Sequence, residues 1–151
     1  INKLQTVFDD SLYDPANEPD IAYPYLFSRF KGEEWRTSKI VSELLAKHFT
    51  AKADGIPGND DTGTMSAWVV FSMMGLYPDI PGVPEYTLTT PAFDKITITL
   101  NKDFYDNDAI IIEKIIANKN RTMIDKQAVD HRITHNDLLN SHTLKFYSPS
   151  N

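Results

Sequence analysis

The stretch GIPGNDDTGTMSAW, residues 55–68, places three oxygen-bearing side chains in a row between a turn and an apolar segment. One of Asn59, Asp60 and Asp61 is expected to be the N-cap of the helix that follows, because Asn and Asp are preferred there. A single carboxylate is enough for a cap. Three neighbouring acceptors repel one another unless a cation or hydrogen-bond donors balance them, so the stretch is also a candidate site for a metal ion or a reacting water. The residues alone leave both interpretations open.

Helical spacing surrounds this stretch up to about residue 80. In KIVSELLAKHF, residues 39–49, apolar side chains and one histidine recur on one face of a helix. Thr37 and Ser38 precede that face and are the expected N-caps. A shorter helix is predicted over residues 23–30, and a third over residues 65–74, where a glycine follows as the expected C-cap.

Beyond a segment rich in proline and glycine, residues 77–86, the apolar period changes to two. The segment KITITL, residues 95–100, alternates apolar residues with threonine, which is typical of a half-buried strand. Residues 109–116 and 142–147 are predicted to be further strands, and THNDLLN, residues 134–140, a helical turn capped by Thr134 or Asn136.

These patterns predict an α+β chain in two parts, helices over residues 1–80 and a β-rich module of about four to six strands over residues 81–151. Each part is small, since short helices bury little surface and a partial sheet leaves edges open. The chain is therefore interpreted as either a small α+β domain or the C-terminal piece of a larger enzyme. Its start, which has neither Met nor a signal-like segment, favours an interior or processed piece.

The composition narrows the class of protein. The 151 residues are 41% hydrophobic and 24% charged, as in a globular protein, with a formal net charge of −6. No basic run predicts a nucleic-acid partner, and no apolar run reaches the roughly 18–20 residues of a membrane span. The absence of cysteine excludes disulfides, thiolate metal sites and a cysteine nucleophile.

A second acidic loop occurs in YDPANEPDIAYPY, residues 13–25. Asn17 and Glu18 lie between two prolines, so the backbone is stiff and their side chains can be aimed. Oxygen ligands of this kind suit Ca²⁺, which takes six to eight of them. No EF-hand pattern is present, so a calcium site would have to be assembled from distant segments. A turn with solvated acids is the alternative.

The four histidines do not have metal-ligand spacing, and we expect structural roles for them. Trp68 is expected to be a core residue, although a tryptophan near a helix start could also line a sugar site.

Three segments, in order, resemble the C-terminal part of glycoside hydrolase family 92. They are NEPD…PYLF, DGIPGNDDTGTMSAWVVFSMMGLYP and TTPAFDKITITL, at residues 17–27, 54–78 and 89–100. The family shows a Gly-Asn-Glu-Pro element, a G-[LI]-P-G-N-[ED]-D-x-G-x-M-S-A-W block and a Pro-x-Phe-Asp-Lys strand entry. The resemblance is specific over Asn17–Leu100 and looser to the end of the chain.

Members of this family are calcium-dependent, inverting exo-α-mannosidases with an N-terminal β-sandwich and an (α/α)6 barrel. The resemblance implies that residues 1–80 are the last barrel helices, that the remainder of the same polypeptide is their partner, and that the substrate is a mannose-containing glycan, most often α-1,2-linked. It also favours a secreted or periplasmic location.

The resemblance also implies site residues. Asp61 matches the general base that activates water. Asn59, an amide where some members carry a second candidate carboxylate, and Asp60 are expected to bind substrate. Asn17 and Glu18 match residues of a Ca²⁺ site that grips the mannose O2 and O3 hydroxyls.

Two departures from the family stand out. Ala16 replaces the usual Gly, and Asp20-Ile21-Ala22 replaces Ser-His-His. The family's general acid, a Glu in a Trp-Gln-Tyr context upstream, does not occur in these 151 residues, so this chain is expected to be inactive by itself. A non-catalytic carbohydrate- or calcium-binding module and a degenerate enzyme kept as a structural partner are the alternatives. An upstream Glu in that context would favour the enzyme.

Overall fold

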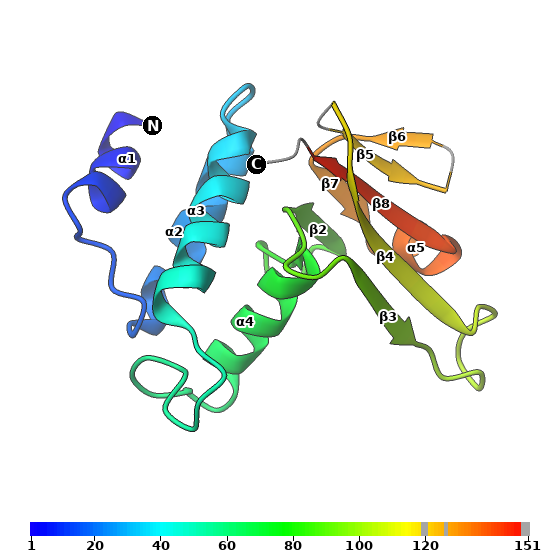
Figure 1. Ribbon diagram of the computed structural model, residues 1–151, viewed down its shortest axis with the longest axis horizontal. Coiled ribbons are helices and arrows are strands. Elements are labelled where there is room, and N and C mark those ends of the chain that lie inside the picture. The colour runs from blue at the N-terminus through cyan, green and yellow to red at the C-terminus, as the bar shows by residue number, and fades with distance from the viewer. Residues whose placement is uncertain (119–120, 126, 149–151) are drawn as a thin grey trace. The chain divides into compact units, whose positions relative to one another are not determined.

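The computed structural model describes residues 1–118, 121–125 and 127–148, and the chain forms two compact units, Ile1–Ser72 and Met73–Asn151 (Figure 1). Among the described residues, every helix is too short or too polar to cross a membrane.

The first unit is helical. Its elements are α1 (Asn2–Asp9), η1 (Glu18–Ala22), α2 (Tyr23–Leu26), η2 (Phe27–Arg29), α3 (Glu34–His48) and most of α4 (Thr64–Met74), the η elements being 3₁₀ helices. The predicted helix over residues 23–30 is therefore an α turn followed by a 3₁₀ turn. The α1 helix was not predicted, and it buries none of its side chains.

The α3 helix begins one turn before the predicted position. Its N-cap is Glu33, so Thr37 and Ser38 lie inside the helix and the prediction that they cap it is wrong. The apolar pattern missed this first turn because Trp35, at 53% exposure, does not continue the buried face. Thr37 is fully buried and faces the core of the unit.

Aromatic side chains build the core of the first unit. Trp68 of α4 is 1% exposed and lies edge-on to Tyr25, with ring centroids 6.3 Å apart. The Phe49 ring stacks on Trp68 with centroids 5.5 Å apart, and the Tyr25 hydroxyl is 2.7 Å from the Ser72 hydroxyl. The expectation that Trp68 is a core residue is confirmed.

The second unit contains two sheets. One has the strand order β1-β2-β7, with bounds Leu76–Tyr77, Glu85–Leu88 and Arg132–Thr134. The other has the order β3-β4-β8-β5-β6, with bounds Lys95–Thr99, Ala109–Ile116, Thr143–Ser148, Arg121–Ile124 and Gln127–Val129. All pairs are antiparallel except β4 with β8. Eight strands are thus described, more than predicted, because β1, β6 and β7 are too short for a readable period.

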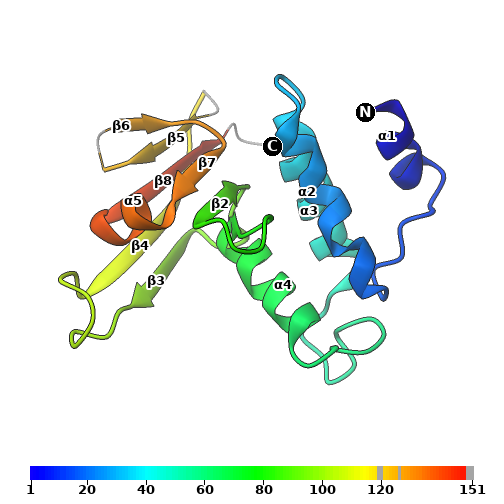
Figure 2. The same ribbon diagram turned by 180° about the vertical axis from the view of Figure 1, so that it is seen from behind.

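The strand β7 runs directly into α5 (His135–Asn140), as Figure 2 shows. Thr134 caps α5 by accepting a 3.1 Å hydrogen bond from the Asp137 N–H, which confirms one of the two predicted caps. Leu138 of α5 packs with Ile110 and Ile112 of β4 in the hydrophobic core of this unit. The alternation predicted for residues 95–100 is also confirmed, since Ile96 and Ile98 pack against that core.

Candidate active site

The loop before η1 is organised by the carboxylate of Asp20, a residue only 9% exposed. The Asp14 N–H donates to its Oδ2 at 3.1 Å, and Asn17 Nδ2 donates to its Oδ1 at 3.2 Å. Asp14 in turn accepts a 2.9 Å bond from the Ala16 N–H. These bonds form because a buried carboxylate needs donors to replace water. They fix the course of the loop that carries Asn17 and Glu18.

Asn17 and Glu18 are both exposed at the start of η1. Asn17 precedes the helix in an extended conformation, with φ −103° and ψ 108°, and its carbonyl accepts the Asp20 N–H at 2.9 Å. Since Asn17 Nδ2 bonds to Asp20, the side-chain oxygen Oδ1 is the atom left to bind a ligand. Together with the Glu18 carboxylate, the loop offers oxygen donors, which are the ligand type that Ca²⁺ takes.

The second loop contains an unusual run of backbone. Asp61, Thr62 and Gly63 have φ values of 47°, 60° and 91°, so three successive residues are left-handed. Glycine tolerates this region and Asp is enriched in it, but β-branched Thr62 is an outlier at a cost of about 1–2 kcal/mol. Local strain of this kind clusters at functional sites, where the surrounding structure maintains it.

The two aspartates next to this left-handed run make different hydrogen bonds. Asp60 Oδ1 accepts a 2.7 Å bond from the Ser66 N–H in the first turn of α4, and the Asp60 carbonyl accepts the Met65 N–H at 3.1 Å. Asp61 receives Thr64 only through its backbone carbonyl. Within the described residues, the exposed Asp61 carboxylate has no hydrogen-bond partner.

The prediction that one of Asn59–Asp61 is the N-cap is therefore wrong in position. The α4 helix starts only at Thr64, because Asp61, Thr62 and Gly63 have positive φ values and cannot belong to a right-handed helix. Asp60 nevertheless satisfies an amide of the first turn from outside the helix, which is the work of a cap.

The two acidic loops touch at one point. An ideal Cβ on Gly58 would lie 2.7 Å from the Ala16 Cβ and 2.9 Å from the Ala16 carbonyl oxygen, so only glycine fits there. A second link is the 3.1 Å bond from Trp68 Nε1 of α4 to the Ile21 carbonyl in η1. The fold thus brings the loop that carries Asn17 and Glu18 against the loop that carries Asn59, Asp60 and Asp61.

An open groove of about 510 Å³ borders the second loop. Asp60 and Gly58 line it together with residues after α3 and along α4, namely Thr50, Lys52, Ala53, Gly55, Ile56, Ser66, Val69 and Val70.

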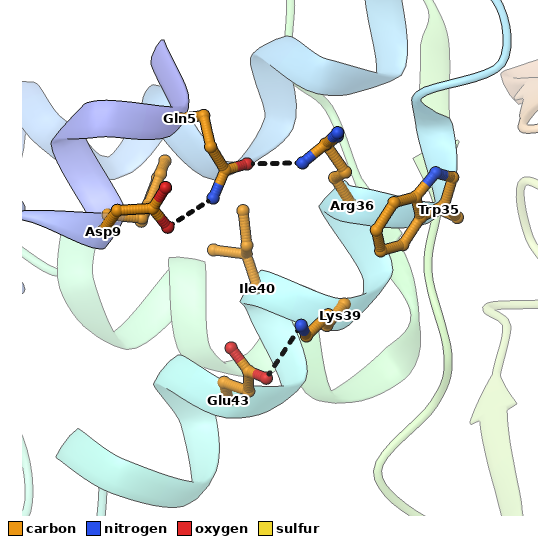
Figure 3. A pocket seen from close by; sticks show the side chains of 8 residues that line it. Gln5, Asp9, Trp35, Arg36, Lys39, Ile40 and Glu43 are labelled. Atoms are coloured by element: carbon orange, nitrogen blue, oxygen red, sulfur yellow. Dashed lines mark hydrogen bonds and ion pairs between the residues drawn. The ribbon is translucent and has the colours of Figure 1, made fainter. Parts of the chain in front are cut away.

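A smaller pocket of about 150 Å³ lies between α1 and α3, and none of the predicted site residues lines it. There Gln5 accepts a 2.8 Å bond from Arg36 and donates a 2.7 Å bond to Asp9 (Figure 3). Its polar side chains are largely bonded to one another.

The metal chemistry fits calcium in part. Within the described residues, no cluster of three or more His, Cys, Asp and Glu side chains is arranged to hold a metal ion. Asn17 and Glu18 provide a hard oxygen pair, which suits Ca²⁺ but falls short of its six to eight ligands. Backbone carbonyls, water or groups beyond this chain would have to complete such a site.

Three contributors to this arrangement were not assigned by the sequence patterns. The loop-organising role of Asp20, the close approach at Gly58 and the hydrogen bond of Trp68 all depend on contacts between segments. The one available signal was the departure from the family at residue 20, where a carboxylate stands three residues after Asn17.

Comparisons with known proteins agree with the motifs. The model of the glycosyl hydrolase family 92 catalytic domain matches residues 1–148. A protein of Arthroderma benhamiae described as an uncharacterized secreted glycosidase is 31% identical over 98 residues, covering 65% of this chain and 12% of that protein.

Two solved structures from Bacteroides thetaiotaomicron are similar in fold and sequence. One is a family 92 α-mannosidase in complex with mannoimidazole, with a TM-score of 0.76 and 26% identity over 91% of this chain. The other is a family 92 inverting mannosidase, with a TM-score of 0.74 and 27% identity over 90% of this chain. This chain spans 19% of the length of each. From its motifs, its family match and its fold, the chain belongs to glycoside hydrolase family 92.

Proposed function

We propose that this chain is the C-terminal part of the catalytic region of an inverting, calcium-dependent exo-α-mannosidase that acts on glycans, chiefly at α-1,2 linkages. The contact between Gly58 and Ala16 carries the proposal, because it joins the loop of the proposed base to the loop of the proposed metal ligands. The family match over residues 1–148 and the similarity to an inverting mannosidase support the reaction type.

Asp61 is the proposed general base. An inverting glycosidase needs one carboxylate to activate water on the face opposite the leaving group, with the acid about 6.5–9.5 Å away. Asp60 already supplies the bond that the first turn of α4 requires, so the Asp61 carboxylate is left for a water. The left-handed backbone from Asp61 to Gly63 supports this role, since Asp61 has a positive φ and Asp60 does not, and the two side chains therefore leave the backbone in different directions.

Asn17 Oδ1 and the Glu18 carboxylate would hold the calcium ion. A calcium ion held there would supply positive charge that could polarise the mannose hydroxyls and favour distortion of the ring toward an oxocarbenium-like transition state. The residues of this chain orient the ligand atoms, since the two prolines and the Asp20 bonds limit how the loop can move.

Asn59 and Asp60 are the proposed substrate-binding residues. Asp60 uses Oδ1 for Ser66, and its second carboxylate oxygen can accept a sugar hydroxyl. Asn59 is exposed and offers both a donor and an acceptor. The groove beside Asp60 gives the aglycone side of a glycan a place to lie.

The proposed partner of the helical unit is the remainder of the same polypeptide. The helical unit would supply the last helices of an (α/α)6 barrel, and the remainder would supply the others. The α4 helix is apolar around its circumference, and Val70 on it is 55% exposed in this chain. A helix of that kind normally lies inside a larger protein. The general acid would come from the upstream part, so this chain alone is expected to be inactive.

The fungal relative, described as secreted, supports a secreted or periplasmic location.

The test is hydrolysis of α-1,2-mannobiose by the full-length parent protein, with and without EGTA, beside its Asp61→Asn variant. We expect turnover to be lost in EGTA, restored by added Ca²⁺, and lost in the variant while circular dichroism stays unchanged. Proton NMR should show the β-anomer as the first product. A parent that binds mannosides without hydrolysing them would indicate the carbohydrate-binding module instead.

A further inference from the structure

We propose that Asp20 is a positioning residue for calcium, which sets the side-chain atom that Asn17 presents to the ion. The inference rests on the proposed function, because it takes Asn17 as a calcium ligand. Asp20 stands at a position where the family usually has Ser, so the resemblance implies no such role for it.

The geometry of the Asp20 carboxylate permits only one orientation of the Asn17 amide. Asp20 is 9% exposed, and its Oδ2 is already bonded to the Asp14 N–H at 3.1 Å. Its Oδ1 is 3.2 Å from Asn17 Nδ2. An ionised carboxylate only accepts hydrogen bonds, so it selects the NH2 group of Asn17 and repels the carbonyl oxygen.

This selection decides whether Asn17 can bind a cation. A side-chain amide carries its oxygen and its nitrogen on the same carbon, and calcium binds the oxygen only. With Nδ2 held by Asp20, Oδ1 remains as the ligand atom. The Asp20 N–H also holds the Asn17 carbonyl at 2.9 Å, so both the backbone and the side chain of Asn17 are fixed by one residue. Groups that orient metal ligands typically change metal affinity about 10–100-fold.

The experiment compares Asp20→Asn with Asp14→Asn in the full-length parent protein, with calcium alone as the titrant in calorimetry. Both changes remove one negative charge from the same loop. Asn at position 14 can still accept the Ala16 N–H through its oxygen, so that loop bond is kept. Asn at position 20 has one acceptor for two donors, and its NH2 would draw the Asn17 oxygen inward.

We expect Asp20→Asn to weaken calcium binding about 10-fold or more and Asp14→Asn to change it less than about 2-fold. In an Asn17→Ala background, Asp20→Asn should cause no further loss, since its effect acts through Asn17. If Asp20→Asn does not fold, Asp20→Ala replaces it, because alanine removes the acceptor of the Asn17 NH2 group.

Equal weakening by the two Asn variants would overturn the inference, since loop charge alone would explain it. Undiminished loss in the Asn17→Ala background would overturn it as well. These failures leave the proposed function standing as long as the parent binds calcium and hydrolyses mannobiose. A parent that binds no calcium removes the calcium part of the proposed function and this inference together.

Discussion

Gly58 and Ala16, from two distant loops, approach so closely that a methyl group on Gly58 would lie 2.7 Å from the Ala16 Cβ. Gly58 also has a φ of +68°, so the position excludes other residues for two reasons. The contact ties the loop of the proposed base to the loop of the proposed calcium ligands.

Gly58→Ala should therefore destabilise the parent protein and lower its activity. Gly32→Ala is the matched control, because Gly32 has a φ of +87° but nothing within 4 Å of the added carbon. We expect about 1–2 kcal/mol for the control and about 1–3 kcal/mol more for Gly58→Ala, measured by urea unfolding. Ala16→Gly in the Gly58→Ala background should recover part of the loss, and equal effects of the two glycine variants would contradict the contact.

Substitutions of the two neighbouring aspartates should differ in their effect on stability. Asp60→Ala removes the acceptor of the Ser66 N–H and should cost about 1 kcal/mol of unfolding free energy. Asp61→Asn should leave stability unchanged and lower kcat by a factor of about 10²–10⁴. Urea unfolding and mannobiose hydrolysis measure the two effects. Asp60→Asn, which keeps an acceptor oxygen, is the control for the cap. An Asp61→Asn variant that remains active would return the acidic stretch to a purely structural role.

The link between α4 and η1 can be tested at Trp68. Trp68→Phe keeps an aromatic ring in contact with Tyr25 and Phe49 but removes the donor to the Ile21 carbonyl. It should cost about 1–3 kcal/mol, whereas Trp68→Ala should cost about 3–5 kcal/mol through the cavity it leaves. If Trp68→Phe unfolds at the same urea concentration as the wild type, the hydrogen bond contributes nothing to this link.

His48 at the end of α3 should make stability depend on pH. Burial, with Lys47 adding repulsion, lowers the pKa of His48 below its ordinary value of 6.5. The unfolded chain therefore takes up a proton before the folded chain does, so stability is greatest above 6.5 and falls as the pH drops toward the lowered folded pKa.

Urea unfolding midpoints measured from about pH 7.5 down to about pH 5.5 should fall less steeply in His48→Gln than in the wild type. An identical slope in the two proteins would show that other groups cause the dependence.

Local patterns predicted the longer elements. The α3 helix and the strands β3 and β8 were expected because each repeats an apolar face, and α4 and β4 were expected because each is a long run of apolar residues. The α1 helix and the two-residue strand β1 were missed, since α1 has no fully buried side chain and β1 is too short to show a period. The start of α3 was misplaced for a related reason, because its first turn exposes Trp35.

The sequence by itself determined which residues are available for chemistry. The motifs around Asn17-Glu18 and Asn59-Asp60-Asp61 carry the family resemblance, and the family match agrees with it. Residue types and short spacings are local properties, so the amino-acid sequence alone is enough to identify them.

Only the tertiary structure decided which role each of these residues has. Three left-handed residues explain why Asp60, and not Asp61, accepts the Ser66 N–H in the first turn of α4. The buried Asp20 carboxylate in turn sets the orientation of the Asn17 amide. The contact of Gly58 with Ala16 joins segments far apart in the chain. Such features depend on backbone conformation and on packing between distant segments, which no local pattern of residue types encodes.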